Sequence, residues 1–65
     1  MDWTTFAIKH GIKWRVEEDP RLNAKIYRFK KEDKRLDYYI PLQVLRYNQR
    51  KLLEEELLRV VRGLV

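Results

Sequence analysis

The sequence contains no cysteine and no serine, and it has only two glycines, two prolines and one histidine. Without cysteine the chain can form neither a disulfide nor a thiolate metal site. Without serine or cysteine it also lacks the most common catalytic nucleophiles. Gly11 and Gly63 lie too far apart to make a glycine-rich phosphate loop. These absences argue against an enzyme, and we expect no catalytic residue and no cofactor.

The titratable residues offer no metal or acid–base site either. His10 is the only histidine, and one imidazole without converging acids cannot build a metal site, so we expect it to be structural. The acidic runs at 17–19 and 54–56 fall in a turn and on a helix surface. Neither place gives the apolar surroundings that raise the pKa of a catalytic carboxyl. We therefore expect no bound metal.

Length and hydropathy set the class of protein. Sixty-five residues form one domain, residues 1–65, with a thin core. An apolar content of 45% excludes full disorder, and no apolar run is long enough to cross a bilayer. The first residues lack the basic and apolar segments of a secretion signal. We expect a cytoplasmic protein without a membrane partner.

The positive charge is concentrated between Lys9 and Arg35. Between Lys9 and Arg35 there are ten basic and five acidic residues, so this stretch holds the whole formal net charge of +5. Trp14, Tyr27 and Phe29 lie among these basic residues. A basic surface of this kind favours a polyanion as partner, either a nucleic acid or an acidic protein.

The apolar pattern predicts a short helix, a strand and a turn at the start of the chain. A helix over Asp2–His10 is favoured because its apolar residues recur every three or four positions. Asp2 can cap the first turn of this helix, and Gly11 follows its last residue. Strict alternation then predicts a strand over Ile12–Glu17, and Glu18–Asn23 has the composition of a turn.

Two more strands and a helical region follow. Strands are predicted over Ala24–Lys31 and Leu36–Ile40, joined by a short polar loop. Pro41 suits the first turn of a helix, and the residues from Leu42 to Val65 have an apolar stripe with the helical period. The stripe is continuous only if the chain bends near Tyr47–Asn48, which predicts a short helix followed by a long one.

The predicted fold class is α+β, with the element order αβββα. Short connections pair consecutive strands as a three-stranded antiparallel meander, and the short N-terminal and long C-terminal helices cover one face. In the middle strand, turning Ile26 inward would bury Arg28 and Lys30, and unpaired buried charges are costly. Tyr27 and Phe29 are therefore expected to face the helices.

The opposite face of the sheet is the candidate binding surface. It is expected to carry Lys13, Arg15, Glu17, Ile26, Arg28, Lys30, Asp37 and Tyr39. Long cations reach phosphates and a tyrosine can stack on a base. The predicted nucleic-acid contacts are therefore Lys13, Arg15, Arg28, Lys30 and Tyr39. The alternative is a solvated face on which the two acids neutralise their cross-strand neighbours.

A second candidate surface lies on the last helix. Leu52, Leu58 and Val65 lie beside or outside its apolar stripe, which predicts a partner interface there. The alternative function is thus a protein-interaction module, either a homodimer or an inhibitor of a host protein. A wide stripe against a broad sheet would also account for these residues.

The layout resembles the short, mostly uncharacterised proteins encoded by phages and prophages. The resemblance covers a tryptophan-containing start (residues 2–7), a basic hairpin segment (26–29) and a Leu/Glu-rich final helix (52–58). It implies a small binding protein, since such proteins include DNA-binding regulators, host-takeover factors and inhibitors of bacterial defence.

Two other families have a similar order of elements. The chain is similar to double-stranded-RNA-binding domains, but it lacks their Gly-Pro and His loop, and only Arg46, Arg50 and Lys51 echo their Lys-rich helix start. The three strands and following helix also look like the arm-binding domains of phage integrases, which lay a sheet in the DNA major groove. That likeness of architecture implies contacts from the same five residues as above.

Overall fold

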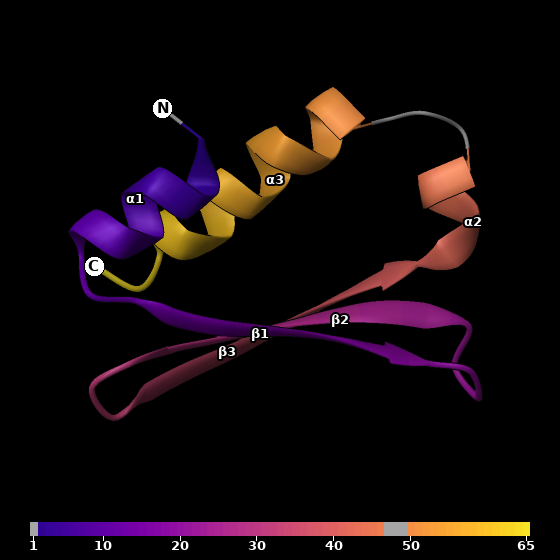
Figure 1. Cartoon of the computed structure of the whole chain (residues 1–65), viewed down its shortest axis with the longest axis horizontal. Helices are drawn as coiled ribbons and strands as arrows, with labels where there is room; N and C mark the ends of the chain where they lie inside the picture. Colours follow the sequence, from indigo (N-terminus) through magenta and orange to yellow (C-terminus); the bar gives the residue numbers. More distant parts are fainter. Residues whose placement is uncertain (1, 47–49) are drawn as a thin grey trace.

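The computed structural model describes residues 2–46 and 50–65. Its elements in chain order are α1 (Trp3–Lys9), β1 (Lys13–Asp19), β2 (Ala24–Lys31), β3 (Lys34–Pro41), α2 (Leu42–Arg46) and α3 (Arg50–Arg62). The strands form an antiparallel sheet in the order β1-β2-β3. Helices α1 and α3 lie side by side over one face of this sheet, and α2 lies next to β3 at one end (Figure 1). The predicted αβββα fold is confirmed.

The C-terminal region divides into two helices, as expected. The bend itself was predicted at Tyr47–Asn48, which lies outside the described residues. None of the described helices has the length and the apolar content that a membrane span requires.

Helix α1 is short because both of its ends are capped. The Asp2 carboxylate accepts a hydrogen bond from the Thr5 backbone N–H at 2.8 Å, and this bond lowers the pKa of Asp2. At the other end Gly11 has a φ of +69°, and the Ile12 N–H donates to the Ala7 carbonyl at 2.8 Å. This backbone path ends the helix at a glycine and delivers Ile12 to the core.

The strands run slightly further than the alternation predicted. Strand β2 matches its expected range, whereas β1 continues to Asp19 and β3 begins at Lys34. Lys31 pairs with Lys34, so the β2–β3 connection is a two-residue turn with Glu32 at a φ of +57°. This tight turn brings Arg35 into the sheet.

The position of Pro41 differs from the prediction. It was placed in the first turn of the helix, but it ends β3 opposite Ala24. The Leu42 N–H then donates to the Asn23 carbonyl at 2.9 Å, which continues the sheet pairing by one bond. Asn23, with a φ of +50°, makes the reversal that positions this carbonyl.

The core lies between the sheet and the two helices, and the predicted facing of β2 is confirmed. Tyr27 and Phe29 are 6% and 2% exposed. Their rings lie edge-on to the Trp3 ring at 5.8 and 5.7 Å, a preferred aromatic geometry. The rest of the buried cluster comprises Ala7, Ile12, Ile40, Leu57, Val61 and Leu64. With this core on one side, the other face of the sheet carries no helix in the described chain (Figure 1).

Candidate nucleic-acid interface

The strand register arranges the open face of the sheet in rows that run across all three strands. Lys13 of β1 lies opposite Lys30 of β2, which lies opposite Arg35 of β3. We call these three residues the cation row. All three are exposed, and none has an acidic partner within 4 Å among the described residues.

The next row along the same face is paired with acids. Arg28 lies between Arg15 and Asp37, and its Nη1 contacts Asp37 Oδ2 at 2.7 Å. Arg28 Nε contacts Glu17 Oε2 at 3.1 Å, and Arg15 Nη1 contacts the other Glu17 oxygen at 3.2 Å. The Arg28 hydrogen bond lowers the pKa of Glu17, and the same bond raises the pKa of Arg28. Arg28 is therefore largely neutralised, whereas Arg15 shares one acid.

A third row is mostly apolar. Ile26 lies between Glu17 and Tyr39, and although it is on the open face it is only 3% exposed. Tyr39 is half exposed, so part of its ring is free to stack on a ligand. The face therefore changes from basic at the β2–β3 hairpin to apolar toward the other end.

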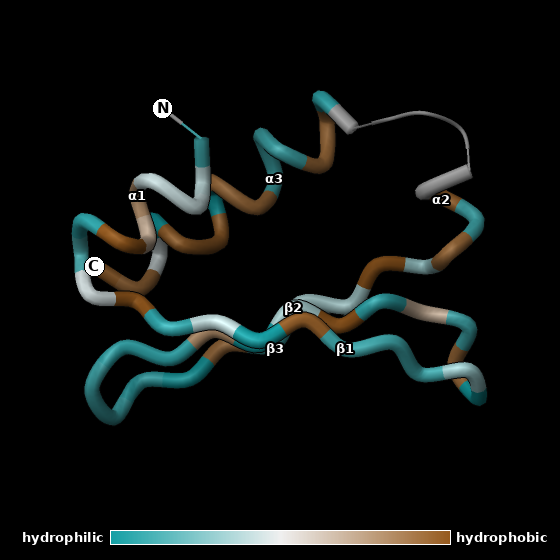
Figure 2. Tube along the Cα trace, viewed as in Figure 1, coloured by the Kyte–Doolittle hydropathy of each residue, from teal (hydrophilic) through white to brown (hydrophobic). Residues whose placement is uncertain are grey.

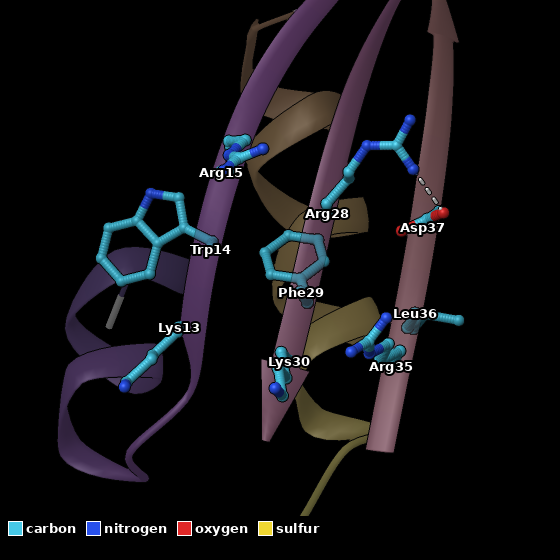
Figure 3. A pocket seen from close by; sticks show the side chains of 9 residues that line it. All are labelled: Lys13, Trp14, Arg15, Arg28, Phe29, Lys30, Arg35, Leu36 and Asp37. Atoms are coloured by element: carbon cyan, nitrogen blue, oxygen red, sulfur yellow. Dashed lines mark hydrogen bonds and ion pairs between the residues drawn. The ribbon is translucent and has the colours of Figure 1, made fainter. Parts of the chain in front are cut away.

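A shallow hollow of about 490 Å³ lies between the cation row and the Arg15–Arg28–Asp37 row (Figure 3). Its remaining lining comes from Trp14, Phe29 and Leu36, which are in register across the strands. Because side chains alternate along a strand, these three contribute backbone to the floor while their side chains turn to the helix side. The hollow thus has a flat floor and carries five cations and one carboxylate.

The charge continues beyond this hollow. Lys31 and Lys34 pair at the hairpin, on the face opposite the cation row. Both hairpin ends of the sheet are hydrophilic (Figure 2). The turn between these two lysines carries Glu32 and Asp33, so the hairpin end holds both signs of charge with an excess of cations.

The structure brings together four of the five predicted nucleic-acid contacts and adds one. Lys13, Arg15, Arg28 and Lys30 line the same hollow, and Tyr39 lies on the same face outside it. Arg35 was missed, because the third strand was predicted to begin at Leu36. The alternation of 35, 37 and 39, traced one step backward, would have found it.

The three predicted interface residues do not form one surface. Leu52 is 60% exposed and lines a hollow of about 230 Å³ with β3 and α2 residues such as Val44. Val65 is 52% exposed and lies beyond the other end of α3. Leu58 was placed well outside the apolar stripe, but it is partly buried and packs against the core, because α1 lies alongside this side of α3.

The remaining titratable groups have structural positions. His10 caps the C-terminal end of α1, with its ring 4.2 Å from that of Phe6. Within residues 2–46 and 50–65, no three His, Asp or Glu side chains converge to hold a metal ion.

Comparison of the chain with protein-family models, with curated protein sequences and with solved structures finds no match in any of the three.

Proposed function

We propose that this protein is a small, non-enzymatic nucleic-acid-binding protein of the kind that phages encode. Its cation row and Arg15 contact backbone phosphates, and Tyr39 supports stacking on the same face. The observation that carries the proposal is the cation row, three like charges in register across three strands. A cytoplasmic location, where nucleic acid is available, belongs to this proposal.

The cation row is costly for the free protein. Side chains directly opposite each other in an antiparallel pair have Cβ atoms about 4.5–5.5 Å apart, and like charges there are destabilising. The neighbouring row shows that this sheet can place acids beside cations, as Asp37 beside Arg28. A phosphate bound between the unpaired cations would convert the repulsion into attraction.

The shape of the row favours a polymer over a single small anion. Adjacent strands lie about 4.8 Å apart, so the row spans roughly 10 Å between its outer backbones. The hollow beside it is open and shallow rather than enclosed. Such a line of charges fits successive phosphates of a nucleic-acid strand, and phosphate contacts are the main source of affinity for such ligands.

The test removes the charges of the cation row and replaces each side chain with an uncharged polar one. We expect Lys13→Gln, Lys30→Gln and Arg35→Gln together to weaken binding of a labelled DNA duplex by at least about tenfold at physiological salt. If each cation contacts one phosphate, the slope of log Kobs against log salt falls by about 3 for the duplex and about 2 for a single strand. Fluorescence anisotropy over a salt series measures both quantities.

The matched control removes the same net charge elsewhere. Arg21, Lys51 and Arg62 are exposed and lie off the open face, so changing all three to Gln should leave most of the affinity. Equal losses in the two triple variants would mean that only net charge matters, and would overturn the proposed site. Circular dichroism of each variant checks that the fold is kept.

The alternative, a protein-interaction module, is favoured by one observation. Leu52 lies exposed at the edge of the apolar hollow formed with Val44 and Tyr39. An apolar interface there depends little on salt, unlike phosphate binding. Loss of self-association in Leu52→Glu, together with a wild type that does not bind DNA, would favour this alternative over the nucleic-acid proposal.

A further inference from the structure

Strand β1 forms an outer edge of the sheet, and among the described residues no other strand covers that edge. Its seven residues pair with β2 one to one without a bulge, and the strand contains no proline. A free edge presents unpaired backbone N–H and C=O groups that can pair with another strand. Its side chains decide which strand fits.

We propose that β1 pairs with β1 of a second copy of this chain, antiparallel and centred on Val16, to form a six-stranded sheet. Two identical strands that pair antiparallel are related by a two-fold axis. If this axis passes through a residue, open-face residues lie opposite open-face residues, because side chains alternate along a strand. The open faces of the two copies are then continuous. Val16 is the middle residue of β1, so all seven residues pair. This inference does not require nucleic-acid binding, although Lys13 and Arg15 belong to both proposed surfaces.

The charges of β1 are self-complementary in this register. On the open face its residues read Lys13, Arg15, Glu17 and Asp19, two cations followed by two acids. Centring on Val16 places Arg15 opposite the partner's Glu17 and Lys13 opposite the partner's Asp19, and each pair occurs twice. Opposite charges directly across an antiparallel pair are stabilising.

Other registers lose this match. Centring on Arg15 or Glu17 opposes two identical charges, and centring on Trp14 places Lys13 opposite the partner's Arg15. The other free edge is less suitable, because centring β3 on Asp37 opposes two aspartates. Centring β3 on Tyr38 brings Pro41, which has no N–H, into the new ladder.

The helix-facing side of β1 provides apolar surface for the same contact. Trp14 is 36% exposed and Val16 is 40% exposed, and the indole ring lies beyond the outer edge of β1 (Figure 3). In the proposed register Val16 lies directly opposite the partner's Val16. Each Trp14 reaches the partner's Val16 diagonally, a distance that aromatic side chains can span. Four apolar side chains thus gather at the dimer axis.

The dimer would also change the proposed nucleic-acid surface. The partner's Asp19 and Glu17 offset the charges of Lys13 and Arg15, whereas Lys30 and Arg35 lie away from the new contact. The dimer would then carry two pairs of Lys30 and Arg35, one from each copy, on one continuous open face. The tests below use protein without nucleic acid, so failure of the dimer and failure of the binding proposal can be distinguished.

The first test uses the absence of cysteine. Directly opposed residues in an antiparallel pair have Cα atoms about 4.5–5.5 Å apart, within the range of a disulfide. We expect Val16→Cys to form a covalent dimer in oxidised glutathione, seen on a non-reducing gel. Leu36→Cys on β3 is the matched control, since Leu36 is 39% exposed, and it should remain mostly monomeric.

The second test exchanges charges. The wild type should sediment at about twice its 8.1 kDa chain mass, and Arg15→Glu, at a side chain 75% exposed, should sediment as a folded monomer. In Glu17→Lys alone, the new cation lies opposite the partner's Arg15, so this variant should also be monomeric. Mixing the two variants restores opposite charges at both positions and should give a heterodimer. A monomeric wild type, or Val16→Cys chains that cross-link no faster than Leu36→Cys chains, would overturn the proposal.

Discussion

At the scale of single residues, the open face is less uniform than its composition suggests. Ile26 lies on the solvent side of the sheet and is nevertheless as buried as the core residue Ile12, each being 3% exposed. Its cross-strand neighbours Glu17 and Tyr39 flank it on both sides. Arg28, one step along β2 on the same face, is fixed by two carboxylates. Ile26 through its burial, and Arg28 through its two ion pairs, therefore help to hold the three strands together.

We expect Ile26→Ala to destabilise the protein by about 2–4 kcal/mol, the usual cost of truncating a buried isoleucine. Urea unfolding followed by circular dichroism measures this free energy. Ile8→Ala, at a residue that is 71% exposed, should cost less than about 1 kcal/mol. If the two changes cost the same, Ile26 does not have the buried environment described above.

At the scale of elements, α1 shows how a seven-residue segment remains helical. An isolated helix of this length is unstable in water, so α1 depends on its two caps and on packing of Trp3 and Ala7 into the core. The glycine that ends it, Gly11, has a left-handed φ, and a Cβ added at this position would meet no atom within 4 Å. Substitution there tests backbone strain alone.

Gly11→Ala should lower the free energy of unfolding by about 1–2 kcal/mol, because alanine is strained at a φ of +69°. Gly11→Asn should cost less, since asparagine tolerates the left-handed region. Thermal and urea unfolding of the two variants measures this difference in backbone strain. If the two variants lose the same free energy of unfolding, Gly11 does not have the left-handed conformation described above.

At the scale of the whole molecule, the ion pairs of the open face make stability depend on pH. Glu17 has its pKa lowered below the ordinary 4.5 by the Arg28 hydrogen bond, and Asp2 has its pKa lowered below 3.8 by the Thr5 N–H. In acid, the unfolded chain therefore binds more protons than the folded one. Stability from these groups is fully present above their unfolded pKa values and is lost as the pH falls through the folded values.

We therefore expect the free energy of unfolding to be nearly constant above about pH 6 and to fall steadily below about pH 5. Glu17→Gln should be less stable at neutral pH and should show a shallower fall in acid. Urea titrations from neutral to acidic pH measure both curves. Parallel curves for the wild type and Glu17→Gln would show that the Arg28 bond does not contribute.

Much of the fold followed from local rules. Alternation and helical period located the elements, and the cost of burying Arg28 and Lys30 fixed which face of β2 meets the helices. The strand ends were less certain, because the length of the β2–β3 turn depends on pairing between Lys31 and Lys34. For the candidate site, this error of two residues hid Arg35.

The sequence by itself determined the order of the elements, the direction in which each side of β2 faces, and the excess of positive charge. These depend on neighbours within a few positions along the chain. Only the tertiary structure decided which cations lie opposite each other, that Ile26 is buried on an open face, and that β1 is an outer strand of the sheet. Register, burial and edges arise from contacts between segments distant in the chain, and no local pattern specifies them.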